Sequence, residues 1–203
     1  MNTIVKGAIV IIGAAGSVGG GYLISQNISK TDTIANHLKA EYLLTKEQTD
    51  KWNHRVGLLK KAQDGDLDES LLPLKKDGLT NKELQDWCFA NLKERFEGTK
   101  SSKFLNVRLY CGLNMGDKIS GNKVSSSTTD SETKLATNFS KLNGKTEQEL
   151  GSELLGIGKK TNQSSGWEGN KALKEWCLKT FDLAFEEISI DYTNAKTYCV
   201  LAS

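Results

Sequence analysis

Four cysteines are the residues of this chain whose type and spacing suggest the most chemistry. Each one directly follows an aromatic residue, in the pairs Trp87-Cys88, Tyr110-Cys111, Trp176-Cys177 and Tyr198-Cys199. Zinc sites and redox catalysts usually use short Cys-x-x-Cys clusters, and the sequence has none. The two histidines, His37 and His54, do not neighbour a cysteine. We therefore expect neither a metal site nor a redox centre, and read the aromatic residues as core residues.

The spacing of the cysteines favours disulfides. Cys88 lies eight residues before Phe96, where one expected helix nears its end, and Cys111 lies nine residues after Ser102, where the next begins. In an antiparallel hairpin the two cysteines therefore lie at similar height. Cys177 and Cys199 stand in the same relation. The spacing predicts the disulfides Cys88–Cys111 and Cys177–Cys199, each contributing about 3 kcal/mol by closing a loop. The alternative is that the four are reduced residues that pack in the core as small apolar side chains.

The cysteine pairs belong to a longer internal repeat. The first copy reads Asn81-Lys-x-Leu-x-Asp-Trp-Cys88, then Phe96-Glu97, Asn106 and Tyr110-Cys111. The second reads Asn170-Lys-x-Leu-x-Glu-Trp-Cys177, then Phe185-Glu186, Asn194 and Tyr198-Cys199. Such duplication is typical of a small fold used twice and not of a single active site.

Helical signals surround the repeated residues. Apolar residues at helical spacing predict a helix over 45–63, with Trp52, Val56 and Leu59 on one face. Capping boxes at Thr80 and Thr146 mark two helix starts. The first repeat helix is expected to run on through Phe96 and the second through Phe185. The fold class we expect is mainly α, with an N-terminal membrane helix followed by two small cysteine-containing helical repeats.

The expected organisation has five parts. They are a transmembrane anchor or cleaved signal at 1–27, a connector at 28–43, helical repeat 1 at 44–111, a polar linker at 112–133 and helical repeat 2 at 134–203. Residues 7–24 carry no charge and are just long enough to span a membrane, so membrane lipid is an expected partner. We expect the bulk of the chain outside the cell, which also permits disulfides.

Other functional classes find little support. The net charge of +2 argues against binding nucleic acid, which relies on neutralising phosphates. Gly13, Gly16 and Gly19 resemble the glycine-rich turn of a dinucleotide-binding dehydrogenase, but no Tyr-x-x-x-Lys follows downstream. An NAD(P)-dependent oxidoreductase using these glycines is kept as an alternative. No nucleophile–base or metalloprotease motif occurs, so we expect no catalytic residues, no cofactor and no enzyme.

The glycine-rich apolar segment, the Leu-x-x-Trp-Cys motifs and the closing Tyr-Cys pairs together resemble a known family. They resemble the large paralogous sets of uncharacterised membrane or surface proteins of haemotropic mycoplasmas. The resemblance rests on Leu84, Trp87-Cys88, Tyr110-Cys111, Leu173, Trp176-Cys177, Tyr198-Cys199 and the segment from Val5 to Leu23. It implies a location more than a mechanism, namely a surface protein for antigenic display or for contact with a host or neighbouring surface protein. A purely structural envelope component is the remaining alternative.

Overall fold

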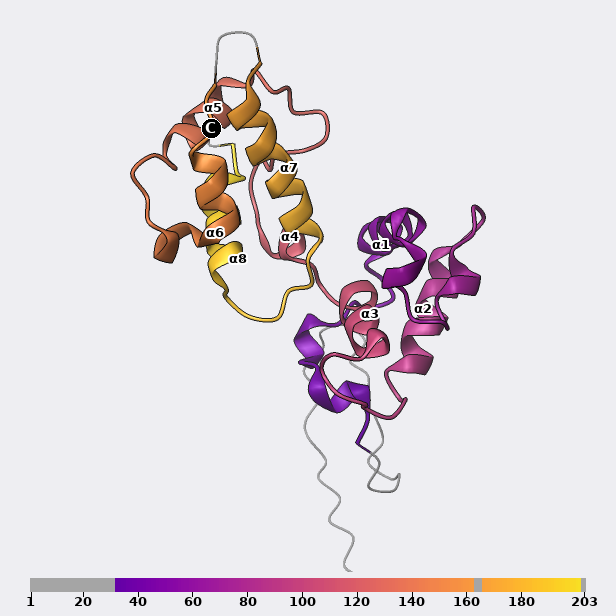
Figure 1. Ribbon diagram of the computed structural model, residues 1–203. Coiled ribbons are helices and arrows are strands. Elements are labelled where there is room, and N and C mark those ends of the chain that lie inside the picture. The colour runs from indigo at the N-terminus through magenta and orange to yellow at the C-terminus, as the bar shows by residue number, and fades with distance from the viewer. Residues whose placement is uncertain (1–31, 163–165, 202–203) are drawn as a thin grey trace, which may run out of the picture.

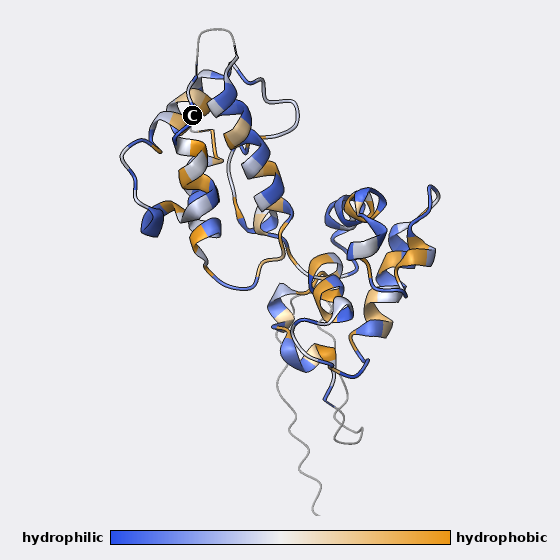
Figure 2. Cartoon of the chain, in the orientation of Figure 1, coloured by the Kyte–Doolittle hydropathy of each residue, from blue (hydrophilic) through white to orange (hydrophobic). Residues whose placement is uncertain are grey.

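The computed structural model describes residues 32–162 and 166–201, and the chain is mainly α-helical over these residues (Figure 1). The described residues form α-helices and short 3-10 helices, and their extended pairings are confined to isolated bridges. We call residues 32–112 repeat 1 and residues 113–201 repeat 2, because the internal duplication begins again near residue 113. The described chain has two hydrophobic cores, and the first also takes in Leu113, Met115 and Phe185 of repeat 2. Figure 2 shows apolar and polar residues alternating around the helices, as expected for amphipathic helices that cover a core.

Three α-helices build repeat 1. They are α1 (Thr49–Lys61), α2 (Asn81–Asn91) and α3 (Ser102–Cys111), joined by the 3-10 helices η1 (Ile34–His37), η2 (Ala40–Tyr42), η3 (Asp64–Asp66) and η4 (Leu72–Leu74). Trp52, Val56 and Leu59 are buried on one face of α1, as their spacing predicts. This apolar face packs α1 against α2 and α3, which together enclose the first core.

Repeat 2 has five α-helices. They are α4 (Met115–Lys118), α5 (Thr133–Ser140), α6 (Glu147–Gly158), α7 (Glu168–Asp182) and α8 (Ile190–Tyr198). The last two helices take the places of α2 and α3, because they carry the second copy of the repeated residues. Figure 1 shows α5, α6 and α8 on one side of α7. Helix α7 packs against each of the three, α8 also packs against α5 and α6, and the second core lies between them.

Both expected capping boxes are present. The Thr80 side chain accepts from the N–H of Glu83, and the Glu83 carboxylate accepts from the N–H of Thr80. Thr146 and Glu149 make the same reciprocal pair at the start of α6. Each box satisfies backbone donors that the first turn of a helix leaves unpaired.

The duplication extends beyond the cysteine-containing hairpins into the segments that precede them. The N–H of Leu44 donates to the carbonyl of Cys111, and the N–H of Val124 donates to the carbonyl of Cys199. Isolated bridges repeat in the same way, Thr33 with Arg95 and Asn114 with Ala184. The repeated unit therefore spans most of the described chain, in two copies that follow each other directly.

Residues 112–133 differ from the polar linker that their composition predicts. Leu113, Met115 and Val124 are buried, and α4 packs against α7. Leu113 itself serves both repeats, since its N–H donates to the Tyr42 carbonyl while its own carbonyl accepts from the N–H of Phe185. Composition misses this because a few apolar residues, spaced among glycines and serines, are enough to join a core.

Two further boundaries differ from expectation. Residues 32–43, expected as part of a connector, belong to the first core through the buried side chain of Ile34. The helices α2 and α7 end before Phe96 and Phe185, which were expected to lie on them. After each helix the chain becomes extended. The backbone groups beside Arg95 and Ala184 pair with those beside Thr33 and Asn114, so they are not available for the hydrogen bonds of a longer helix.

The expected anchor at 1–27 lies outside the described residues. Within 32–162 and 166–201, no helix combines the length and the apolar character needed to cross a bilayer.

Candidate functional site at the junction of the two repeats

Each repeat is closed by its own disulfide. Cys88 in α2 is bonded to Cys111 in α3, and Cys177 in α7 is bonded to Cys199 beside α8. The Cα–Cα distance is 5.5 Å in both, and all four residues are buried. These are the pairs that the spacing predicts, and they leave no cysteine of the chain free as a nucleophile or ligand.

The aromatic residues beside the cysteines are core residues. Trp87, Trp176, Tyr110 and Tyr198 are all buried. Burial, with the nearby Asp66 carboxylate as a smaller cause, raises the pKa of Tyr110 to about 12, so its phenol stays neutral. Trp87 and Tyr110 therefore belong to the first core, and Trp176 and Tyr198 to the second.

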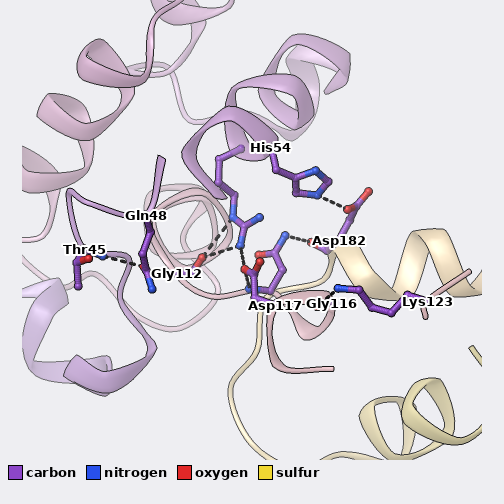
Figure 3. Close-up of polar contacts among 10 residues, drawn as sticks. Thr45, Gln48, His54, Gly112, Gly116, Asp117, Lys123 and Asp182 are labelled. Atoms are coloured by element: carbon purple, nitrogen blue, oxygen red, sulfur yellow. Dashed lines mark hydrogen bonds and ion pairs between the residues drawn. The ribbon is translucent and has the colours of Figure 1, made fainter. Parts of the chain in front are cut away.

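Among the described residues, four ion pairs cross the junction between the repeats. In each of them repeat 1 supplies the cation and repeat 2 the carboxylate. The pairs are Arg55–Asp117, His54–Asp182, Lys39–Glu187 and Arg108–Glu186, and the histidine pair is ionic when His54 is protonated. Figure 3 shows His54 facing Asp182, with Asp117 beside them. This consistent polarity makes one face of each repeat complementary to the other.

Arg55 is the most buried member of the junction. Its side chain has no exposed surface, and its guanidinium donates to the Gly112 carbonyl and to the Asp117 carboxylate. Loss of solvation lowers the pKa of Arg55 despite the attraction of Asp117. The pair therefore depends on both members, because a buried guanidinium without its carboxylate is strongly unfavourable.

The position of Asp117 follows from the short helix α4. A Cβ added at Gly116 would lie 2.9 Å from the Cβ of Phe181, so glycine lets α4 approach α7 closely. The Asp117 carboxylate also accepts from the N–H of Asn114 at 2.8 Å, which closes a capping box. Asn114 in turn donates to the Asp182 carbonyl at 2.7 Å. These contacts within repeat 2 hold the Asp117 carboxylate in position to pair with the Arg55 guanidinium.

A cleft of about 280 Å³ lies beside two of these ion pairs, Lys39–Glu187 and Arg108–Glu186. Aromatic rings from both repeats line it, and Tyr42 meets Phe185 edge-on with the ring centres 5.0 Å apart. Behind the lining residues, Phe185 also meets Tyr192 edge-on at 5.0 Å. The ammonium group of Lys118 lies 5.3 Å from the centre of the Phe185 ring. Both repeats are therefore needed to form this cleft.

Three exposed aliphatic residues lie in the loop from α7 to α8 or at the start of α8, in a segment whose Glu186 and Glu187 line the cleft. Ile188 is 79% exposed, Ile190 41% and Leu183 40%. The corresponding loop of repeat 1 has Glu94, Thr99 and Ser102 at the matching places. We call Leu183, Ile188 and Ile190 the junction loop cluster. Exposed aliphatic side chains gathered in one loop are typical of a contact surface.

The sequence analysis missed Arg55 and Asp117. A usable signal exists for Arg55, which lies between Trp52 and Leu59 on the apolar face of α1, where an arginine is out of place. Asp117 carries no such signal, because its role depends on an approach of α4 to α7 that only the fold reveals.

Two other candidate sites were weighed from the sequence. The first is the proposed dinucleotide-binding turn, and its glycines, Gly13, Gly16 and Gly19, lie outside the described residues. Over the described part of the chain, no three residues among His, Cys, Asp and Glu come together to hold a metal ion. No protein-family model, curated protein or solved structure matches this chain.

Proposed function

We propose that this chain is a non-enzymatic, membrane-anchored surface protein that displays two disulfide-closed helical repeats for contact with another protein. The observation that carries the proposal is the pair of buried disulfides, one in each repeat. Structural disulfides persist in oxidising compartments and are rare in the cytosol. The uncharged segment 7–24 supplies the proposed anchor that keeps the repeats at the outer surface.

The junction loop cluster is the proposed contact surface. It combines strongly exposed aliphatic side chains with a cleft whose walls come from both repeats. Glu186 and Glu187, between Leu183 and Ile188, are held by Arg108 and Lys39 across the junction, which ties the loop to repeat 1. Such tethering favours contact by lowering the ordering cost of the loop. The expected partner is a host protein or a neighbouring surface protein.

Surface display is tested by labelling intact cells with a membrane-impermeant amine reagent. Lys82 is the reporter, because its side chain is 80% exposed and it takes no part in the ion pairs of the junction. We expect Lys82 to be labelled in intact cells to the same extent as in lysed cells, with a cytosolic protein as the unlabelled control. Labelling of Lys82 only after lysis would contradict display.

Contact through the loop is tested by photo-crosslinking on intact cells. A photoreactive residue replaces Ile188 in one variant and Leu72, an exposed aliphatic residue of repeat 1 that does not line the cleft, in the other. We expect a discrete crosslinked product from position 188 and none from position 72. Equal products from both positions, or none from either, would overturn the assignment of the contact surface.

A further inference from the structure

A second, larger cavity lies within repeat 2, away from the junction. Its volume is about 690 Å³, and it opens between α5, the turn that follows α5 and the C-terminal half of α6. Ligand pockets for small organic molecules usually fall between about 300 and 1,000 Å³. The cavity is therefore large enough for a small organic ligand, and neither the disulfides nor the junction uses it.

One part of the wall of this cavity is apolar. Phe139 and Leu142 are largely buried side chains of the second core, and Ala136 and Leu155 continue the same surface from α5 and α6. A ligand seated here would cover apolar surface that water now contacts, which favours a ligand with a hydrocarbon part.

The rim of the cavity is cationic. Lys145, Lys159 and Lys160 line it, and no aspartate or glutamate is among its lining residues. Lys145 is held by Glu149 at 2.8 Å, whereas Lys159 and Lys160 make no ion pair with the described residues. Two exposed ammonium groups without a carboxylate partner thus stand beside an apolar pocket.

Repeat 1 provides an internal reference for these lysines. The matching pair, Lys75 and Lys76, is neutralised by Asp64 at 2.5 Å and Glu83 at 2.6 Å. Repeat 2 keeps the two lysines but lacks acidic partners for them among the described residues. The duplication has therefore left two cations of repeat 2 available to an external anion.

We propose that this cavity binds an organic phosphate monoester with an apolar body, held by Lys159 and Lys160 at the phosphate and by the Phe139–Leu155 surface at the hydrocarbon. A phosphate monoester carries a charge of about −1.5 to −2 near pH 7, which matches two unpaired ammonium groups. Lysine binds such groups well as a compact point charge. Free organic phosphates and single-chain lipid phosphates share this chemistry.

The test measures binding to the full-length protein in nanodiscs of neutral phosphatidylcholine. Hexyl phosphate is the main probe, inorganic phosphate is the probe without hydrocarbon, and 1-hexanol is the probe without charge. A single-chain lipid phosphate then distinguishes a membrane source from a free one by its affinity relative to hexyl phosphate. We expect saturable binding of hexyl phosphate and much weaker binding of the other two small probes. Equal affinity for hexyl and inorganic phosphate, or no saturable binding, would overturn the proposal.

Matched variants locate the site. Lys159→Gln with Lys160→Gln removes both free cations, and we expect about a tenfold or greater loss of affinity for hexyl phosphate. Lys75→Gln with Lys76→Gln removes the same net charge from repeat 1 and should leave the affinity unchanged. Leu155→Ser should weaken hexyl phosphate more than inorganic phosphate. Equal losses in the two lysine variants would show nonspecific charge attraction and contradict the assigned site.

Discussion

Gly112 of repeat 1 and Val200 of repeat 2 occupy equivalent positions, and a different type of side chain donates to the backbone carbonyl of each. In repeat 1, Arg55 donates to the Gly112 carbonyl and reaches on to Asp117 of repeat 2. At the matching place in repeat 2, Asn138 donates to the Val200 carbonyl at 2.9 Å and to the Tyr198 carbonyl at 3.0 Å, within its own repeat. The short amide closes its own repeat, whereas the long guanidinium closes its repeat and joins the next one.

Because of this difference, the two repeats are joined through unlike faces. Repeat 1 presents cations toward repeat 2, which presents carboxylates in return. The outer end of repeat 2 has Asn122, Thr137 and Asn138 at the places of Tyr42, His54 and Arg55. A polar end of this kind is typical of a terminal repeat. One scaffold thus serves as a joining unit in one copy and as an end unit in the other.

The largest expected effect comes from removing the carboxylate of the buried pair. Asp117→Ala leaves the Arg55 guanidinium buried without a counter-charge, and we expect a loss of about 3–5 kcal/mol in the free energy of unfolding. Urea unfolding followed by circular dichroism measures it. His54→Ala breaks the neighbouring exposed pair and should cost less than about 1 kcal/mol. Equal losses in the two variants would show that the buried pair does not join the repeats.

Arg55→Asn sharpens the same comparison by giving repeat 1 the residue of repeat 2. We expect this variant to lose less stability than Asp117→Ala, because it leaves no buried cation and Asp117 can be hydrated at its exposed edge. The same urea titration measures the difference. A larger loss from Arg55→Asn than from Asp117→Ala would contradict the account of the junction.

The disulfides give the next largest effect. Cys88→Ser with Cys111→Ser, and Cys177→Ser with Cys199→Ser, should each lower the free energy of unfolding by about 3 kcal/mol, because the closed loops are nearly equal in length. Thermal denaturation under oxidising conditions measures both. A double variant whose melting temperature equals that of the unchanged protein would show that its disulfide does not stabilise that repeat.

Two buried asparagines should give smaller and matching effects. Asn106 donates to the Asp66 carbonyl at 3.1 Å, and Asn194 donates to the Glu149 carbonyl at 3.0 Å. Asn106→Ala and Asn194→Ala should each cost about 1–3 kcal/mol, because partly buried backbone carbonyls lose their donors. The exposed Asn143→Ala is the control and should change stability by less than about 0.5 kcal/mol. Unequal losses at 106 and 194 would mean that the repeats do not use this contact equally.

The smallest effect concerns acid stability. A hydrogen bond from Lys76, followed by those from Thr80, lowers the pKa of Glu83 to about 2, and Lys145 and Thr146 lower the pKa of Glu149 to about 2. Because both folded-state pKa values lie below the ordinary value of 4.5, this stabilisation is present above pH 4.5 and is lost as the pH falls toward 2. Glu83→Gln and Glu149→Gln should each flatten the pH dependence of unfolding in that window. An unchanged slope in either variant would contradict the capping-box assignment there.

The sequence predicts the parts of this fold that depend on local patterns. The apolar face of α1 and the capping boxes at Thr80 and Thr146 follow from spacing alone, and the cysteine pairing follows from helix position. Such features are readable because they involve residues a few turns apart. Because the duplication repeats the same cysteine spacing, the hairpin predicted for the first copy is also predicted for the second.

The junction could not be predicted, because it depends on contacts between distant segments. Leu113 appears in the sequence as the start of a polar stretch, yet its backbone bonds to both Tyr42 and Phe185. The ends of α2 and α7 were misplaced for the same reason, since bridges to Thr33 and Asn114 compete with helix continuation. Periodicity describes one segment at a time and carries no information about such pairings.

Each repeat carries its own disulfide, and we propose that both repeats lie on an oxidising side of a membrane. Non-reducing peptide mass spectrometry on protein from its native membrane fraction tests it most directly. We predict two linked peptide pairs, Cys88 with Cys111 and Cys177 with Cys199. Four free thiols, or a bond between a cysteine of repeat 1 and a cysteine of repeat 2, would contradict the account.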